Sequence, residues 1–156
     1  MKKLFLLMGI SILVVLLLTG CRTESSLSFK LSYEDSVLAK NVDGSWEIVE
    51  DTKFAKGDTI ALILLNVQGF EKGEDGLNWM DIDVEVKDSK GTVILNEKNL
   101  LGESGKLELE NNTADSPYGS FITNNDTPSG KYEMKVTVHD KIGGGKAVCS
   151  KSLIIE

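Results

Sequence analysis

The chain has 156 residues, of which 41% are hydrophobic and 26% are charged, and its formal net charge is −7. This length allows one domain with a sizeable core. The acidic balance argues against nucleic acid as a partner, because phosphates would repel the protein, and we expect the excess acid mainly to keep the domain soluble.

The first 20 residues have the pattern of a secretory signal peptide. Lys2 and Lys3 make a positive start, and the uncharged run LFLLMGISILVVLLL follows at residues 4–18. This order of a basic and then an apolar region is typical of an export signal. The alternative is an uncleaved membrane-spanning helix, which needs about 20 apolar residues. The stretch from Leu4 to Gly20 is close to that length, so length alone leaves both interpretations open.

The residues that end this stretch favour cleavage. The sequence Leu18-Thr19-Gly20-Cys21 resembles the lipobox of bacterial lipoproteins, in which Leu, a small or hydroxyl residue, and Gly or Ala precede Cys. The resemblance implies cleavage after Gly20 and lipidation of the Cys21 thiol with diacylglycerol carrying acyl chains such as palmitate. It therefore implies a membrane anchor in the cell membrane or outer membrane, with the domain on the extracytoplasmic side.

Cleavage would leave 136 residues with 15 basic and 24 acidic side chains, a net charge of −9. We predict a signal peptide at residues 1–20, a short polar lipidated tether at 21–26, and one domain at 27–156. If Cys21 carries the lipid, Cys149 has no partner within the chain, and we expect it to be a small buried hydrophobe rather than half of a disulfide.

Alternation of apolar and polar residues predicts strands throughout the domain. The first strand is predicted at residues 27–33. A hairpin follows at residues 37–50, with its turn at Asp43-Gly44, a dipeptide that readily supplies positive φ angles. A turn at Gly57-Asp58 precedes the apolar run 60–67, which we interpret as a central strand buried on both faces.

The second half of the domain continues this pattern. Residues 80–86 alternate apolar and acidic side chains, which predicts one dry and one wet face. A turn at 88–91 leads into a strand at 92–95, and residues 96–105 form a predicted loop with room for one short helical turn. Further strands are predicted at 106–110, 118–123, 131–139 and 146–155. The intervening sequences are a polar loop at 111–116, a turn at 127–130 and a glycine bend at 143–145.

The segment Pro128–Tyr132 resembles the tyrosine corner of immunoglobulin-like sandwiches, in which a Tyr hydroxyl bonds to upstream backbone. The resemblance places Met134 where antibody domains have a Cys, with Leu62 or Leu64 on the facing strand, and it places Trp79 roughly at the core tryptophan of strand C. We therefore predict an all-β fold, an immunoglobulin-like or fibronectin-type-III-like antiparallel β-sandwich of about seven to nine strands. This architecture is shared by many unrelated families, so it does not identify a function.

The sequence offers no convincing catalytic group. His139 and Asp140 are adjacent in a predicted strand and therefore point to opposite faces, so one cannot orient the other. We expect His139 to be a surface residue on the face of Lys131 and Glu133. Gly143–Gly145 is explained by a hairpin and has no phosphate-loop context. We predict that the protein is not an enzyme and that it needs no cofactor.

Two binding alternatives remain open at this stage. Acidic residues gather at Glu71, Glu74, Asp75, Asp81 and Asp83. Ca²⁺ takes six to eight oxygen ligands, but the spacing here does not match the common calcium loop. A solvated loop without metal is the default interpretation.

The second alternative is a carbohydrate platform. The aromatic residues considered for it are Trp46, Tyr33, Trp79 and Tyr118. Ordinary packing of these rings is the stronger interpretation.

The preferred hypothesis is a lipid-anchored, non-catalytic interaction or structural module of the cell envelope. It would present its sandwich surface to another envelope protein. A carbohydrate- or calcium-binding module on the cell surface is the alternative. An enzyme would require a cleft with convergent polar groups.

Overall fold

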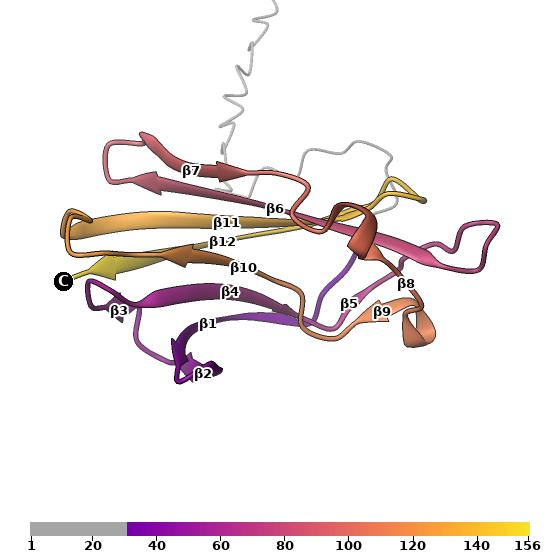
Figure 1. Ribbon diagram of the computed structural model, residues 1–156, viewed down its shortest axis with the longest axis horizontal. Coiled ribbons are helices and arrows are strands. Elements are labelled where there is room, and N and C mark those ends of the chain that lie inside the picture. The colour runs from indigo at the N-terminus through magenta and orange to yellow at the C-terminus, as the bar shows by residue number, and fades with distance from the viewer. Residues whose placement is uncertain (1–30) are drawn as a thin grey trace, which may run out of the picture.

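The computed structural model describes residues 31–156, which form an all-β sandwich (Figure 1). Eight strands in this range have five or more residues. This number lies within the predicted seven to nine. The predicted signal peptide, the tether and residues 27–30 lie outside the described residues. Within residues 31–156 the helical segments are 3₁₀ turns of four and three residues, too short to span a membrane.

The smaller sheet has four antiparallel strands in the order β10-β4-β1-β2. Their bounds are β1 Asp35–Val42, β2 Ser45–Val49, β4 Thr59–Leu65 and β10 Tyr118–Ile122. The strand β4 lies at the centre, between β1 and β10.

The larger sheet has the order β3-β12-β11-β6-β7, with β8 paired to the start of β6. Its bounds are β3 Lys53–Phe54, β6 Asn78–Asp88, β7 Val93–Glu97, β8 Lys106–Leu107, β11 Gly130–Asp140 and β12 Lys146–Ile155. The remaining elements are β5 Val67–Gln68, β9 Thr113–Ala114, η1 Gly102–Gly105 and η2 Glu110–Asn112. The pairing of β3 with β12 is parallel, and β11 pairs with β12 from Gly130 to His139.

The first hairpin is confirmed with its predicted turn. Val42 pairs with Ser45 across Asp43 and Gly44, whose φ angles are 52° and 87°. Two positive φ angles are the requirement of a type I′ turn, whose twist matches that of the flanking strands. The local dipeptide therefore sets the register of β1 against β2.

The central strand is buried on both faces, as the apolar run predicts. Ile60, Leu62 and Leu64 point into the sandwich and are 0% exposed, while the intervening Ala61 and Ile63 are 0% and 8% exposed on the other side. Apolar burial is the main stabilising contribution to folding, so β4 is the strand around which the smaller sheet assembles.

The tyrosine corner is confirmed as a local geometry. The Tyr132 hydroxyl donates to the Pro128 carbonyl oxygen at 2.6 Å. Two residues further on, Met134 is fully buried in the same core as Leu62 and Leu64. Cys149 is also a buried core residue. The core around Met134 is therefore apolar.

We predict that Tyr132→Phe lowers the free energy of unfolding by about 1–2 kcal/mol, because it leaves the Pro128 carbonyl without this donor. Urea denaturation monitored by fluorescence measures the change. Tyr118→Phe is the matched control, since Tyr118 is 43% exposed and has no hydroxyl hydrogen bond within residues 31–156. Equal effects of the two substitutions would contradict a stabilising role for the corner.

The first strand differs from the prediction. In the described part of the predicted stretch 27–33, residues 31–33 form only an isolated bridge, between Ser32 and Gln68, and β1 begins at Asp35. The physical reason lies in the partner strand. Asn66 adopts a φ of 53°, which separates β4 from β5, so the chain beside them is also interrupted near Glu34.

The expected strand at residues 106–110 is likewise shorter than predicted. It is confined to Lys106–Leu107, which pair with Trp79 and Asn78. The chain then enters η2, where Asn111 and Asn112 adopt φ angles of 52° and 55°. Left-handed residues cannot continue a strand. The short helical turn expected within residues 96–105 is present as η1.

The placement of Trp79 as a core tryptophan was wrong. In β6 the core side chains are Ile82, Val84 and Val86, and Trp79 is an odd number of positions from each of them. Because successive side chains alternate across a strand, Trp79 lies on the outer face. There its Nε1 donates to the Gly102 carbonyl oxygen at 2.9 Å, and Lys106 Nζ lies 4.4 Å from the ring centroid.

Candidate functional site

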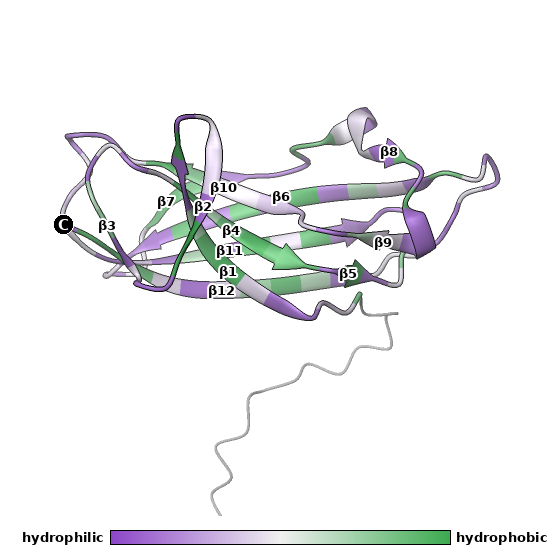
Figure 2. Cartoon of the chain, turned by 90° about the horizontal axis from the view of Figure 1, so that it is seen from below, coloured by the Kyte–Doolittle hydropathy of each residue, from purple (hydrophilic) through white to green (hydrophobic). Residues whose placement is uncertain are grey.

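The outer side of the smaller sheet is apolar, and we call it the apolar face. Its members alternate with the core residues along the four strands, as the pairing registers show. They are Val37 and Ala39 of β1, Trp46 and Ile48 of β2, Ala61, Ile63 and Leu65 of β4, and Tyr118 and Ile122 of β10. The polar residues on this side are Asp35, Asn41, Thr59 and Ser120. Figure 2 shows β4 hydrophobic along most of its length.

The centre of the apolar face is closed by one aromatic side chain. Ala39 and Ala61 are paired neighbours with no exposed surface, and Trp46 packs against the cluster that they form with Ile63. The Trp46 and Tyr118 ring centroids are 5.2 Å apart with planes at 64°, an edge-to-face contact typical of stable aromatic pairs. Small residues in the middle of the sheet therefore make room for a large ring from its edge.

The margins of the apolar face remain open to solvent. Ile122 is 72% exposed and Ile48 is 64% exposed, on the two edge strands β10 and β2. Single exposed hydrophobic residues are common in soluble proteins. Here they stand at the two edges of a sheet face whose centre is apolar, and exposed apolar residues grouped on one face are a feature of protein contact sites.

The four aromatic residues considered for a carbohydrate platform are not brought together. Trp46 and Tyr118 meet on the apolar face, but their planes are not coplanar. The Tyr33 ring packs against the main core, and its hydroxyl donates to the Val148 carbonyl oxygen at 3.3 Å. Trp79 lies on the outer side of the other sheet. The residues therefore divide among three environments.

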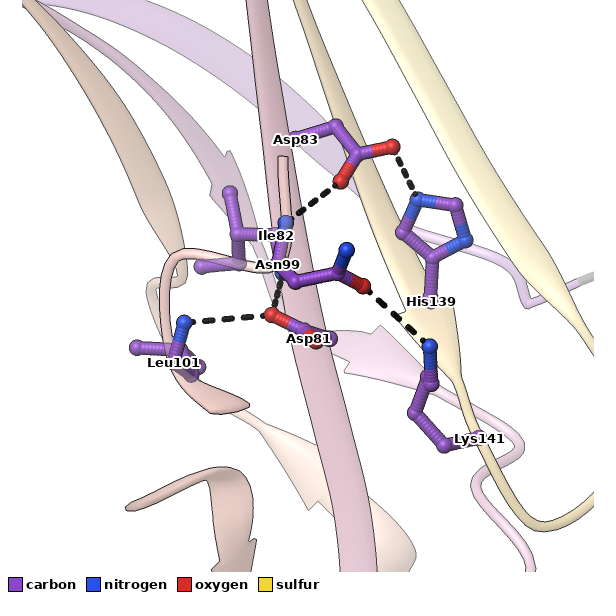
Figure 3. A network of polar contacts seen from close by, with 7 residues as sticks. All are labelled: Asp81, Ile82, Asp83, Asn99, Leu101, His139 and Lys141. Atoms are coloured by element: carbon purple, nitrogen blue, oxygen red, sulfur yellow. Dashed lines mark hydrogen bonds and ion pairs between the residues drawn. The ribbon is translucent and has the colours of Figure 1, made fainter. Parts of the chain in front are cut away.

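The outer side of the larger sheet is polar and carries cross-strand ion pairs. Lys135 Nζ of β11 lies 2.7 Å from Glu85 Oε1 of β6, and Lys87 lies 3.1 Å from the same oxygen. His139 Nε2 lies 2.8 Å from Asp83 Oδ2 (Figure 3). The two outer faces of the sandwich thus differ sharply, one apolar and one ionic.

These contacts change the acidity of two carboxyl groups. Partial burial raises the pKa of Asp83, but hydrogen bonds from the Asn99 N–H and from His139, with the charges of His139 and Lys98, lower it below its usual value overall. The hydrogen bond from Lys135, and then the one from Lys87, lowers the pKa of Glu85. Both groups are therefore stabilised in the charged form in the folded state.

We predict that part of the acid sensitivity of folding comes from Asp83. Its contribution to stability is complete above its unfolded pKa of about 3.9, and it is lost as the pH falls through the lower folded pKa. The urea midpoint of Asp83→Asn should therefore fall less steeply than that of the unsubstituted protein between about pH 5 and pH 2.

Asp115→Asn provides the control for this measurement. Asp115 is exposed and its side chain makes no hydrogen bond within residues 31–156, so its substitution should leave the pH slope unchanged. An Asp83→Asn protein whose slope equals that of the unsubstituted protein would refute the assignment.

His139 and Asp140 occupy opposite faces, as predicted from their adjacency. His139 lies on the outer face, although its side chain is only 18% exposed because it pairs with Asp83. Asp140 is buried at the inner side, where its carboxylate accepts hydrogen bonds from the Glu71 and Ile142 N–H groups at 2.9 Å each. Asp140 therefore holds backbone in place and does not orient His139.

The acidic residues around the loop 71–83 do not converge on one point, and the carboxylates of Asp75 and Asp81 accept hydrogen bonds from different backbone N–H groups. Asp75 Oδ1 accepts from the Leu77 N–H. Asp81 was expected on a wet face, and this was wrong: it is 2% exposed because residues 99–101 cover it, and its Oδ1 accepts from the Leu101 and Ile82 N–H groups (Figure 3). Within residues 31–156, no group of three or more His, Cys, Asp or Glu side chains is placed to hold a metal ion.

A groove of about 640 Å³ opens at one end of the sandwich, and we call it the β10–β7 groove. Its apolar lining comes from Ile94 of β7, Phe121 and Ile122 of β10, and Tyr132 of β11. Its polar rim is formed by the turn 88–90 and the loop 124–131, which contribute two Asp and two Lys side chains. Sequence reasoning missed this groove because its walls come from two stretches that are far apart in the chain, 88–94 and 121–132.

No protein-family model and no curated protein matches the chain. Among solved structures, it is similar to the C-terminal domain of Wzt, with 10% sequence identity over 76% of this chain and 70% of the other, and a TM-score of 0.47. It is also similar to the soluble domain of PmoD from Methylocystis sp. ATCC 49242 (Rockwell), with 12% identity over 82% and 98% of the two chains and a TM-score of 0.38. Similarity at this level identifies neither a family nor a function.

Proposed function

We propose that the protein is a lipid-anchored, non-catalytic interaction module on the extracytoplasmic side of a cell membrane or outer membrane. Residues 1–20 would be removed as a signal peptide, Cys21 would carry the lipid, and the domain would contact another envelope protein. The observation that carries the interaction proposal is the apolar face, whose marginal residues Ile48 and Ile122 are 64% and 72% exposed.

The anchor rests on the sequence before the domain. Leu18-Thr19-Gly20 precedes Cys21 in the order that a lipobox requires. The position of Cys149 supports it, because this thiol is buried in the core and lies 3.2 Å from the Ser36 hydroxyl. Because the Cys149 thiol is buried, we expect no disulfide between it and Cys21, so the Cys21 thiol would be available for acylation.

We also infer that the sandwich is immunoglobulin-like. In that fold one sheet has the strand order A-B-E-D and the other contains C, F and G. The orders β1-β4-β10 and β6-β11-β12 are what strands A, B, E and C, F, G would make. The hydroxyl contact of Tyr132 at the start of β11 supports the same assignment. In this correspondence, the position of strand D beside β10 is not filled by any strand of residues 31–156.

Acylation provides the test of the anchor. In cells given labelled palmitate, we expect the full chain to incorporate the label and Cys21→Ser to incorporate none, with the corresponding difference in intact mass. Cys149→Ala is the matched cysteine control and should be labelled normally, since Cys149 is buried. Unchanged labelling and mass in the Cys21→Ser protein would refute lipidation at this residue.

The interaction is tested by placing a charge on the apolar face. Ile122→Lys should reduce recovery of a specific envelope protein from gently solubilised membranes, because it introduces a charge into an apolar contact. Val93→Lys is the control on the other sheet, where Val93 is 45% exposed. Equal recovery with both substituted proteins, at unchanged melting temperature, would exclude the apolar face as the contact.

A further inference from the structure

The strand β10 has an open edge. It pairs with β4 on one side only, and no other strand within residues 31–156 pairs with it. Pro117 and Thr123 flank β10; the Leu64 N–H of β4 donates to the Pro117 carbonyl oxygen, and the Thr123 N–H donates to the carbonyl oxygen of Asp58, which directly precedes β4, each at 3.0 Å. In an antiparallel ladder the bonded pairs alternate. The backbone groups of Tyr118, Ser120 and Ile122 therefore point away from β4, and we call them the β10 edge.

The other sheet edges are protected in ways that β10 is not. Proteins block sheet edges with short strands, charged residues or irregular pairing. The strand β3 has only two residues, and β2 carries Glu47. The strand β7 pairs with β6 through an irregular register. The β10 sequence, YGSFI, has neither a charge nor a proline, so its backbone groups remain available to another strand.

The larger sheet extends one strand further than the smaller sheet on this side. Gly119 of β10 faces Val84 of β6, so β10 lies over β6, and β7 continues beyond it with no strand of the smaller sheet above. Ile94 of β7 is accordingly 45% exposed, and the β10–β7 groove opens there between Ile94 and Ile122. The step between the two sheets corresponds to the spacing of one strand, about 4.8 Å.

This step between the sheets favours a single extended segment over a second copy of the domain as the occupant of the β10 edge. A single extended segment beside β10 would lie above β7, and its end next to Ile122 would enter the groove. A second copy of the domain paired edge to edge through β10 would instead bring its own β6 to the place that β7 occupies. The groove rim has two Lys and two Asp side chains, Lys90, Lys131, Asp88 and Asp126, so its charge is balanced and does not demand a strongly charged ligand.

We propose that the β10 edge binds an extended peptide segment of another envelope protein as an added β-strand. Backbone hydrogen bonds to Tyr118, Ser120 and Ile122 would supply affinity. Apolar side chains at every second position of the segment would point toward the larger sheet, where one of them would pack against Ile94. The proposal rests on the proposed interaction function, and it specifies the partner as an extended strand with alternating apolar residues.

Amide hydrogen exchange of the lipidated protein in detergent micelles tests the proposal. The probe is a capped nine-residue peptide of alternating valine and threonine with a lysine at each end. At a concentration of about ten times its Kd, we expect exchange at the Tyr118, Ser120 and Ile122 amides to slow about tenfold. The same peptide with alternate amides N-methylated on the edge that would face β10 should give no protection.

Substitutions at the centre of the β10 edge separate binding from folding. Ser120→Pro removes a donor that points away from β4, so it should abolish protection while the β4 ladder and the melting transition persist. Ser120→Ala keeps the donor and should bind normally. Absence of protection with the unmethylated peptide, or equal protection with the methylated one, would overturn the proposal. Protection that appears without peptide and grows with protein concentration would also overturn it, by showing a second copy at the edge.

The peptide measurement does not depend on the anchor. The Cys21→Ser protein should bind the peptide as the lipidated protein does, because the β10 edge contains no residue of the tether. A failure of acylation and a failure of strand addition are therefore seen separately.

Discussion

Gly119→Ala is expected to lower the free energy of unfolding by about 1–3 kcal/mol, because it overpacks the core. A Cβ at Gly119 would overlap Val84 Cγ2 and lie 2.8 Å from Val136 Cγ2. Val84 and Val136 are 1% and 0% exposed, so neither has free space into which to move. The φ of Gly119 lies outside the left-handed region, so the cost comes from packing. The absence of a side chain is what lets β10 approach β6.

A double-mutant cycle with Val84→Ala isolates this contact. Val84→Ala alone should destabilise by leaving a cavity, but it also makes room for a methyl group at position 119. We therefore expect Gly119→Ala to cost less in the Val84→Ala background, with a coupling energy of about 1–2 kcal/mol. Urea denaturation, monitored by tryptophan fluorescence, measures all four proteins. Strictly additive costs would show that Gly119 and Val84 do not compete for the same space.

Met134→Ala is expected to cost about 2–5 kcal/mol, a large part of the 5–15 kcal/mol by which a domain is typically stable. Met134 is 0% exposed near the middle of β11, and its side chain belongs to the same buried cluster as Leu62 and Leu64. Truncation removes apolar contacts and leaves a cavity that the rigid sheets cannot close. Unfolding in urea gives the value directly.

Met134→Leu is the matched substitution, because it nearly conserves volume and should cost less than about 1.5 kcal/mol. The pair of substitutions separates loss of packing from loss of the sulfur atom. If Met134→Ala were as mild as Met134→Leu, the surrounding side chains would have closed the cavity, and the expected loss of packing at Met134 would be refuted.

Much of the strand pattern was predictable because alternation is a local property of the chain. The apolar residues of β11 and β6 recur at period two, and this pattern needs no knowledge of their partners. The turn at Asp43-Gly44 was predictable for a similar reason, since two positive φ angles are a property of these residue types. The tyrosine corner spans only Pro128–Tyr132 and was therefore also visible in the sequence.

The misplacement of Trp79 shows a signal that was present and not used. Trp79 lies three and five residues before Ile82 and Val84, so its side chain points to the face of β6 opposite to theirs, away from the core. Asp81 is different, because its parity was correct and its burial was not foreseeable. The residues that cover it, at 99–101, approach β6 only after the chain has turned through β7.

The apolar face and the β10 edge were only partly visible in the sequence. The run at 60–65 indicated burial on both sides of one strand. It did not indicate that Trp46, from another hairpin, would close the centre of the outer side or that Tyr118 would meet it. The open edge depends on the order of strands in the sheet, which no short segment encodes.

The sequence by itself determined the strand pattern, the type I′ turn, the tyrosine corner and the all-β class, because each depends on neighbouring residues and on the two-residue period of a strand. The prediction that Cys21 is a lipidation site rests on a motif that is equally local. Only the tertiary structure decided which strands lie at the edges, which outer face is apolar and which is ionic, and where the β10–β7 groove opens. These features are created by contacts between residues distant in the chain, such as Gly119 with Val84, which form only when the two sheets pack together.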